Sequence, residues 1–444
     1  EYVEMADFDT VQIGTYIDLW FAEDEVRRKN CRRVLLEDEA NRAVRELAQI
    51  PLLLALLCLV YEERNEIPPD RHEIYEEAMR ALLSKWDANR NISRDVVYQQ
   101  LSLGRKVKML AMIAAQTFEK GDYFLQETEV VQLIGDYLQG VPGLIEYDAE
   151  KVLQSLEEQH GIFVERARHI HSFSHLTIQE YLTARFVVNE NAGTIERLMR
   201  HIGNDRWREV FLLVAMMLGD ATKFCEQYLE ATKELLHKDT QLIAHLKWGQ
   251  LKGEAAQMFY KPAATRAYLY YQALDYALDL DQNLDRDRDL ALALARSRAS
   301  ALDYALDPAL ARSRDLSVTS ESKVANGSDL ALALQVTERR QLPAMAEELK
   351  KLTAPKNTAG VETRRAFTKR LSAILEQYRD RWDPYRLLTI STEEALMWKS
   401  LTKSQIEYWQ RYLQANLLLV RCLQVAYVPN RQVLEDQILL PPKI

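Results

Sequence analysis

The sequence has little cysteine, glycine or proline for its length, and it lacks a long apolar run. Its 444 residues include 4 Cys, 14 Gly and 12 Pro. The cysteines lie far apart and lack paired metal-ligand spacing, which excludes a disulfide framework and a cysteine-based zinc module. The longest apolar stretch, residues 50–61, is too short to span a bilayer. We therefore expect free thiols, a cytoplasmic location and no membrane segment.

Signatures of common enzymes are also absent. The sequence has no Gly-x-x-x-x-Gly-Lys-Ser/Thr loop, whose amides would wrap phosphates and whose hydroxyl would reach Mg²⁺. It has no Gly-x-Ser-x-Gly and no His-Glu-x-x-His motif. His169 and His171 alternate as on a strand, and we expect two exposed hairpin histidines because no further zinc ligands lie nearby. No catalytic residue or metal ligand is assigned, and we expect no nucleotide hydrolysis by this chain alone.

Helix-forming residues dominate what is present. Leucine, alanine, glutamate and arginine are abundant, and all four favour helix. The formal net charge is −9 with both signs plentiful, so the composition indicates no dominant basic face for nucleic acid. A chain of this length usually forms about two to four domains. The composition predicts a mainly α protein.

The middle of the chain shows a recognisable order of elements. Three helical segments, 96–118, 127–138 and 148–159, precede a short hairpin between residues 161 and 173. This is the order of a winged helix, which in DNA-binding proteins places its last helix in the major groove. Here that helix carries three glutamates against Lys151 alone, which disfavours phosphate contact. We interpret the winged helix as an internal packing and sensing module that does not bind nucleic acid.

The hairpin continues directly into a helix. Thr177 and Glu180 have the spacing of a capping box, which predicts a helix start near Thr177. His175 then lies just ahead of a helix N-terminus, where backbone N–H groups and the helix dipole favour an anion such as phosphate. From the residues alone, His175 is either a phosphate contact or a buried polar residue that ties the hairpin to the helix.

Two motifs resemble those of a known family. Phe173-Ser-His-Leu-Thr-Ile-Gln-Glu-Tyr181 resembles the Phe-x-His-x-Thr-x-Gln-Glu-Phe/Tyr signature that closes the winged helix of NACHT-type STAND NTPases, here of a bacterial, cyanobacterial type. The resemblance implies that His175 contacts the β-phosphate of bound ADP and holds the protein closed. Ile50-Pro-Leu-Leu-Leu resembles the family's Asn-Pro-Leu-Leu-Leu segment, with Ile50 in place of Asn, and implies that Pro51 packs on adenine. From the residues alone, Pro51 is equally a helix start without a ligand.

The resemblance extends as a pattern over nearly all of the chain and implies five parts. They are the end of a nucleotide-binding domain (1–36), a first helical domain (37–93), a winged-helix domain (94–190), a helical linker domain (191–259) and a C-terminal helical domain with local duplications (260–444). In the last part, Ala273-Leu-Asp-Tyr-Ala-Leu-Asp279 returns at 301–307, and its Ala and Leu favour helix. The expected fold class is mainly α: a helical domain, a winged-helix domain with a small β-hairpin, then an α-helical C-terminal region.

The function that the resemblance implies is nucleotide-controlled signalling. The chain would be the C-terminal portion of an NTPase whose phosphate loop and acidic Mg²⁺-binding motif lie upstream of Glu1. ADP would hold the protein closed, and exchange for ATP would open it for self-association, with a role in defence. Its partners would be nucleotide, bound through the missing N-terminal domain, and further copies of itself; the trigger, the effector and the choice of ATP or GTP stay open. The alternative is a non-enzymatic α-helical scaffold for protein–protein interaction.

Overall fold

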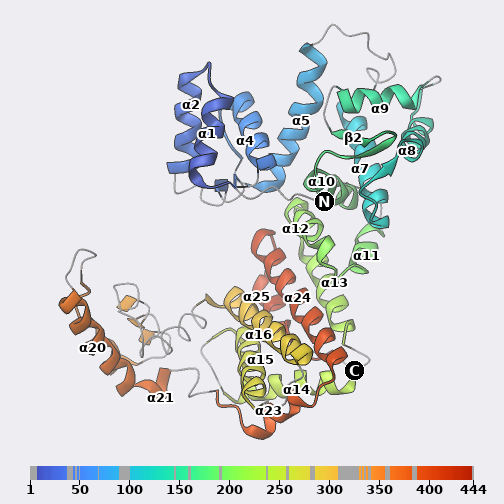
Figure 1. Ribbon diagram of the computed structural model, residues 1–444. Coiled ribbons are helices and arrows are strands. Elements are labelled where there is room, and N and C mark those ends of the chain that lie inside the picture. The colour runs from blue at the N-terminus through green and yellow to red at the C-terminus, as the bar shows by residue number, and fades with distance from the viewer. Residues whose placement is uncertain are drawn as a thin grey trace. The chain divides into compact units, whose positions relative to one another are not determined.

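The chain divides into two compact units (Figure 1). Unit 1 comprises Glu1–Ile195 and Glu209–Met217, and unit 2 comprises Glu196–Arg208 and Leu218–Ile444. The computed structural model describes residues 8–37, 44–45, 48–49, 51–68, 70–89, 101–144, 147–158, 162–189, 193–236, 239–256, 260–280, 286–308, 330–331, 333–334, 337–338, 342–355, 361–382 and 388–442. The predicted boundaries after 93, 190 and 259 involve residues outside these ranges, so the five-part division stays a prediction.

Unit 1 begins with a small helical layer. Its elements are α1 (Thr10–Trp20), α2 (Glu25–Arg32), the π-helix η1 (Arg33–Glu37), α4 (Pro51–Arg64) and α5 (Arg71–Asn89). Asp9 caps α1 through a capping box with Gln12, and Pro51 is the first residue of α4, as the sequence predicts. Their apolar faces meet in one core, which includes both Cys31 and Cys58. The two thiols lie close together there, although they are far apart in sequence.

The second part of unit 1 is a winged helix. Its elements are α7 (Leu103–Lys120), β1 (Leu125–Gln126), α8 (Glu127–Gln139), α9 (Ala149–Glu158), β2 (Phe163–Ala167), β3 (Ile170–Phe173) and α10 (Leu176–Asn189). The strands form an antiparallel sheet in the order β1-β3-β2. The predicted order of three helices and a hairpin is confirmed. Two details differ: α7 begins at Leu103, where Ser102 caps it, and β1 adds a third strand.

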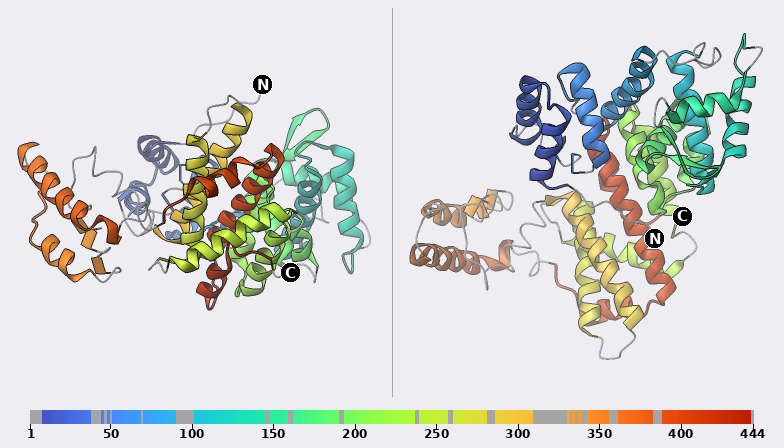
Figure 2. Two further views of the ribbon diagram at one scale, coloured as in Figure 1. Left: turned by 90° about the horizontal axis from the view of Figure 1, so that it is seen from below. Right: turned by 45° about the horizontal axis from the view of Figure 1, so that its top comes forward.

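The regular elements of unit 2, among its described residues, are all helices. The elements that lie wholly or mainly in it are α11 (Thr194–Met199), η3 (Asp205–Trp207), α13 (Thr222–Glu234), α14 (Thr240–Ala255), α15 (Pro262–Asp279), α16 (Arg286–Leu306), α19 (Pro343–Lys350), α20 (Val361–Gln377), α21 (Arg379–Trp382), α23 (Thr392–Lys399), α24 (Lys403–Val425) and α25 (Arg431–Gln437). Helices α15 and α16 lie side by side and α24 packs on α16 (Figures 1 and 2). Tyr270 of α15, Trp398 of α23 and Trp409 of α24 form a fully buried aromatic cluster. The duplicated Leu- and Ala-rich segments at 273–279 and 301–306 are helical, as predicted.

The fold class is therefore the expected one, mainly α with a small sheet. One further helix, α12 (Arg208–Met217), belongs to unit 1 from Glu209 onward although the chain on both sides of it belongs to unit 2. Within the ranges given above, no helix combines the length and apolarity needed to cross a bilayer.

Candidate functional site

His175 lies between strand β3 and helix α10, directly before the first helical residue. Its carbonyl oxygen accepts the N–H groups of Ile178 and Gln179 at 3.2 and 3.4 Å, which starts the helix. The first N–H groups of an α-helix have no partner within the helix, so those of Leu176 and Thr177 can serve a ligand. His175 is exposed at the surface, although neighbouring atoms shield part of its imidazole from solvent. The structure thus places the imidazole where an approaching anion can reach it.

A second cationic side chain, Arg166, is directed toward the same helix end. The pairing of β2 with β3 shifts register between Glu165 and Ala167, so Arg166 occupies a bulge. A bulge turns a strand side chain away from its regular direction. Here Arg166 Nε donates to Ser172 Oγ at 2.9 Å, and a terminal nitrogen donates to the Ser174 carbonyl at 3.0 Å. These two bonds fix the guanidinium next to the residue that precedes His175.

The side chains of His175 and Arg166 differ in charge at neutral pH. Partial burial, followed by the positive charge of Arg166, lowers the pKa of His175 below its ordinary value of 6.5. At neutral pH the imidazole is therefore mostly uncharged and offers one N–H as a hydrogen-bond donor. Arg166 carries the permanent charge, and the N-terminus of α10 adds its dipole. The arrangement suits a phosphate, which needs both charge compensation and several donors.

The other polar residues of the Phe173–Tyr181 motif hold α10 in place. Gln179 Nε2 donates to Thr117 Oγ1 of α7 at 2.9 Å, and both side chains are buried. Tyr181 stacks on Tyr75 of α5 with ring centroids 5.1 Å apart. They thus attach the helix that follows His175 to α7 and α5.

The predicted capping box at the start of α10 is wrong. Thr177 is the second residue of the helix and so cannot be its N-cap. Glu180 is 8% exposed, and its charged neighbours are Glu209 and Arg71. Arg71 pairs with Glu209 at 2.8 Å. Burial, then repulsion by Glu209, raises the pKa of Glu180 to about 8. Glu180 thus belongs to a buried polar cluster between α5, α10 and α12.

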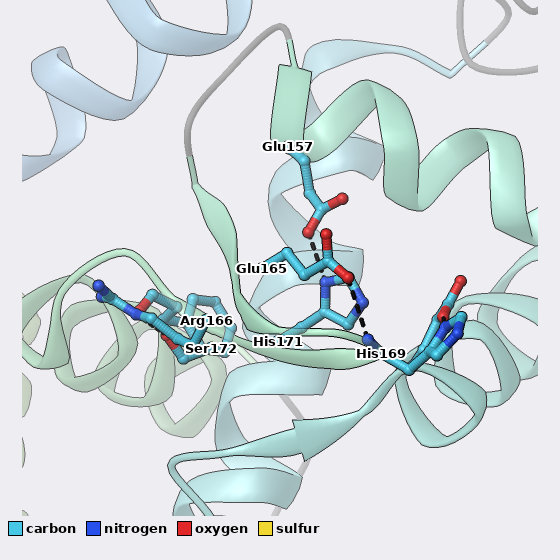
Figure 3. A network of polar contacts seen from close by, with 8 residues as sticks. Glu157, Glu165, Arg166, His169, His171 and Ser172 are labelled. Atoms are coloured by element: carbon cyan, nitrogen blue, oxygen red, sulfur yellow. Dashed lines mark hydrogen bonds and ion pairs between the residues drawn. The ribbon is translucent and has the colours of Figure 1, made fainter.

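The two hairpin histidines are not both exposed. His169 lies in the turn with a φ of 61° and is exposed, whereas His171 on β3 is 4% exposed. Figure 3 shows His171 directed toward Glu157 of α9, to which its Nδ1 is hydrogen bonded. His169 pairs through Nδ1 with Glu127 of α8, which raises the pKa of His169. The prediction of two exposed rings is wrong for His171 because β3 begins only at residue 170 and its inward face carries that ring.

Among the residues that the structure describes, no hydrogen bond or ring contact joins Pro51 to His175. It starts α4, which packs on α1, α2 and α5, whereas α10 packs on α7, α5 and β3. Helix α5 thus contacts α4, whose first residue is Pro51, and α10, which begins directly after His175. Among the residues that the structure describes, no group of three or more His, Cys, Asp and Glu side chains could hold a metal ion.

Three helices and a three-stranded wing define a winged-helix domain within a mainly helical chain. Residues 71–187 match the family model of the winged helix-turn-helix domain C-terminal to NACHT. The chain thus contains a NACHT-associated winged helix, and the match includes α5, which we assigned to the first helical domain. A comparison with curated proteins found no match.

The sequence located His175 but not Arg166 or the cluster around Glu180. A motif and a helix start are local signals, and they suffice for His175. The direction of Arg166 depends on a bulge, and the partners of Glu180 come from helices more than 25 residues away in either direction. An arginine within the hairpin, a few residues before the motif histidine, is the signal that could have indicated a second polar contact.

Proposed function

We propose that this chain is the C-terminal, nucleotide-sensing part of a bacterial NACHT-type STAND NTPase. The observation that carries the proposal is the match of residues 71–187 to a NACHT-associated winged helix, with His175 of its closing motif exposed at the start of α10. The nucleotide would be ADP or ATP, held with Mg²⁺ mainly by an upstream NACHT domain. The bound state would control opening and self-association in the cytoplasm, in a signalling role such as defence.

In this proposal the winged helix contacts the β-phosphate of ADP. Neutral His175 donates one hydrogen bond, and the free N–H groups of Leu176 and Thr177 complete the set of donors. Pro51 would cover the adenine from α4. When ADP leaves, the winged helix loses its attachment to the nucleotide-binding domain, and the protein opens. The chain supplies no phosphate loop, so hydrolysis would depend on the upstream domain.

The test uses the protein expressed with its upstream NACHT domain. His175→Ala should lower the amount of ADP that co-purifies, measured by chromatography after denaturation, by about tenfold or more, since a lost hydrogen bond to a charged group costs about 1.5–3 kcal/mol. The same variant should self-associate without a trigger, measured by light scattering.

His169→Ala is the matched control, because His169 is also exposed on the same wing but lies away from the N-terminus of α10. It should retain ADP like the parent protein. Equal ADP retention and unchanged assembly in both variants would remove the sensing role. An upstream reading frame without a phosphate loop would favour the scaffold function instead.

A further inference from the structure

Unit 2 contains a groove between α16 and α24. Its volume is about 520 Å³, within the roughly 300–1,000 Å³ range of small-molecule sites. It is lined by Ser297, Ser300, Ala301, Tyr304 and Ala305 of α16, by Pro308 just after that helix, and by Leu417, Arg421 and Gln424 of α24. Gln424 Nε2 donates to the Ala305 carbonyl at 3.0 Å and so ties the two walls together. The groove is a product of helix packing within one unit.

Arg421 brings an uncompensated positive charge to this groove. It is half-buried, and within the described part of the chain it makes no hydrogen bond or ion pair. Loss of solvent, then the nearby charge of Arg208, lowers the pKa of Arg421. By contrast, the buried Arg266 donates to the backbone carbonyls of Asp436 and Ile438. The guanidinium of Arg421 has no protein acceptor among the described residues, so its N–H groups are available to an anion in the groove.

The duplicated segment supplies an internal comparison for the apolar wall. Tyr276 in the first copy hydrogen bonds to Thr392 at 3.0 Å, whereas the equivalent Tyr304 in the second copy is 52% exposed and lines the groove. Asp275 in the first copy pairs with Arg296 at 2.6 Å. The tyrosine hydroxyl of the first copy is thus used in packing. In the second copy Asp303 and Asp307 are also buried, and Asp307 accepts a hydrogen bond from the N–H of Lys261. Only Tyr304 leaves its aromatic face at the groove, where Ser297 and Ser300 lie just before the copy.

We propose that the groove between α16 and α24 binds a small organic anion with an apolar or aromatic body. Arg421 holds the phosphate or carboxylate with Ser297 and Ser300, and Tyr304 packs against the body of the ligand. The local positive charge of Arg421 and Arg208 selects an anion although the whole chain carries a net charge of −9. Nucleotide sensing through His175 plays no part in this site.

Phenyl phosphate is the first probe, and the 444-residue chain carrying His175→Ala is the protein, so that phosphate binding at the winged helix is weakened. Titration calorimetry should show phenyl phosphate binding about tenfold more tightly than inorganic phosphate, because an aromatic contact adds roughly 1 kcal/mol or more. Benzyl alcohol should not bind measurably. Benzoate, compared with phenyl phosphate, identifies which anionic group the site prefers.

Arg421→Gln should weaken the affinity for phenyl phosphate by about tenfold or more. Arg296→Gln, which removes an arginine of α16 that already pairs with Asp275, should leave this affinity unchanged. Tyr304→Ala should abolish the preference over inorganic phosphate, and Tyr276→Phe should not.

A second variant covers the case in which Arg421→Gln fails to fold. Ser300→Asp places a carboxylate in the groove wall and should compete with the probe, whereas Ser300→Asn should not. If neither phenyl phosphate nor benzoate binds at about 10 mM, the proposal is overturned, because a dissociation constant above that concentration is too weak for a specific site. Binding that survives both Arg421→Gln and Ser300→Asp would overturn it as well.

Discussion

Glu180 shows how one buried residue can make the stability of unit 1 depend on pH. Its pKa is about 8 in the folded chain against an ordinary value of 4.5, because it is buried beside Glu209. An acid with a raised pKa binds its proton more tightly in the folded state. Its contribution to stability is therefore complete below about pH 4.5 and declines as the pH rises toward about pH 8. The neutral form is the one that fits between α5, α10 and α12.

Glu180→Gln should remove this decline, because glutamine imitates the protonated acid. We expect the parent chain to lose on the order of 2 kcal/mol of unfolding free energy between about pH 5 and about pH 8 relative to the variant. Urea denaturation followed by circular dichroism measures the difference. Asp136→Asn, at an exposed carboxylate on α8, is the control and should follow the parent. A variant that declines as steeply as the parent would show that Glu180 does not titrate in this range.

At the scale of single elements, helix α14 has a glycine whose lack of a side chain is required. A Cβ at Gly249 would lie 2.4 Å from the hydroxyl of Tyr270, which is fully buried against Trp398 and Trp409. Alanine would gain roughly 1 kcal/mol in helix propensity. The ring of Tyr270 cannot move away from the new methyl group, because it is enclosed by its neighbours. Overpacking of this kind costs about 1–3 kcal/mol or more. The cost of the clash should therefore exceed the gain in helix propensity.

Gly249→Ala should therefore lower the melting temperature of the chain, whereas Gly253→Ala in the same helix should raise it. The nearest atom to a Cβ at Gly253 is Cγ of Arg266 at 3.7 Å, an ordinary contact, so the gain of roughly 0.5–1 kcal/mol in propensity remains. Calorimetry of the two variants checks the opposite signs. Stabilisation by both alanines would mean that Tyr270 moves aside at little cost.

Helix α9 occupies the position that reads DNA in other winged helices, but its charges serve the protein itself. Lys151 pairs with Asp148 at 3.1 Å, and Glu157 holds His171 of the wing. Glu150 is exposed. We expect no measurable binding of a duplex at about 0.15 M salt, because phosphate contacts need uncompensated Lys or Arg. Fluorescence anisotropy with a labelled duplex of about 20 base pairs, long enough for one binding site, checks this. A salt-dependent micromolar affinity would contradict it.

Elements were easier to predict than contacts. The helices of the winged helix and the Leu- and Ala-rich helices follow from local composition and periodicity, which the sequence displays directly. Strand β1 has only two residues and exists through its pairing with Ile170 and His171, about 45 residues further along the chain. The contact of Cys31 with Cys58 and the burial of Glu180 likewise depend on which helices pack together. Such features need tertiary structure, whereas His175 needed only a motif and a helix start.

At the scale of the whole molecule, the four cysteines divide evenly between the two units. Cys31 and Cys58 lie in the core of unit 1, and Cys225 and Cys422 are equally buried in unit 2. Burial raises the pKa of Cys225 to about 12, and contact with Cys31 and burial raise that of Cys58. Buried thiols with raised pKa values react only when the surrounding structure opens. Each pair of thiols thus reports the opening of its own unit.

Iodoacetamide labelling read by mass spectrometry should therefore distinguish the units. Gly249→Ala acts in the core of unit 2, and each 1.4 kcal/mol of lost stability should speed labelling of Cys225 and Cys422 by about tenfold when opening is fast and reversible. Cys31 and Cys58 should keep the parent rate. Gly253→Ala supplies the control, with slower labelling of the unit 2 pair only. Equal acceleration of all four cysteines by Gly249→Ala would show that the two cores open together, and the division into two independently stable units would then be wrong.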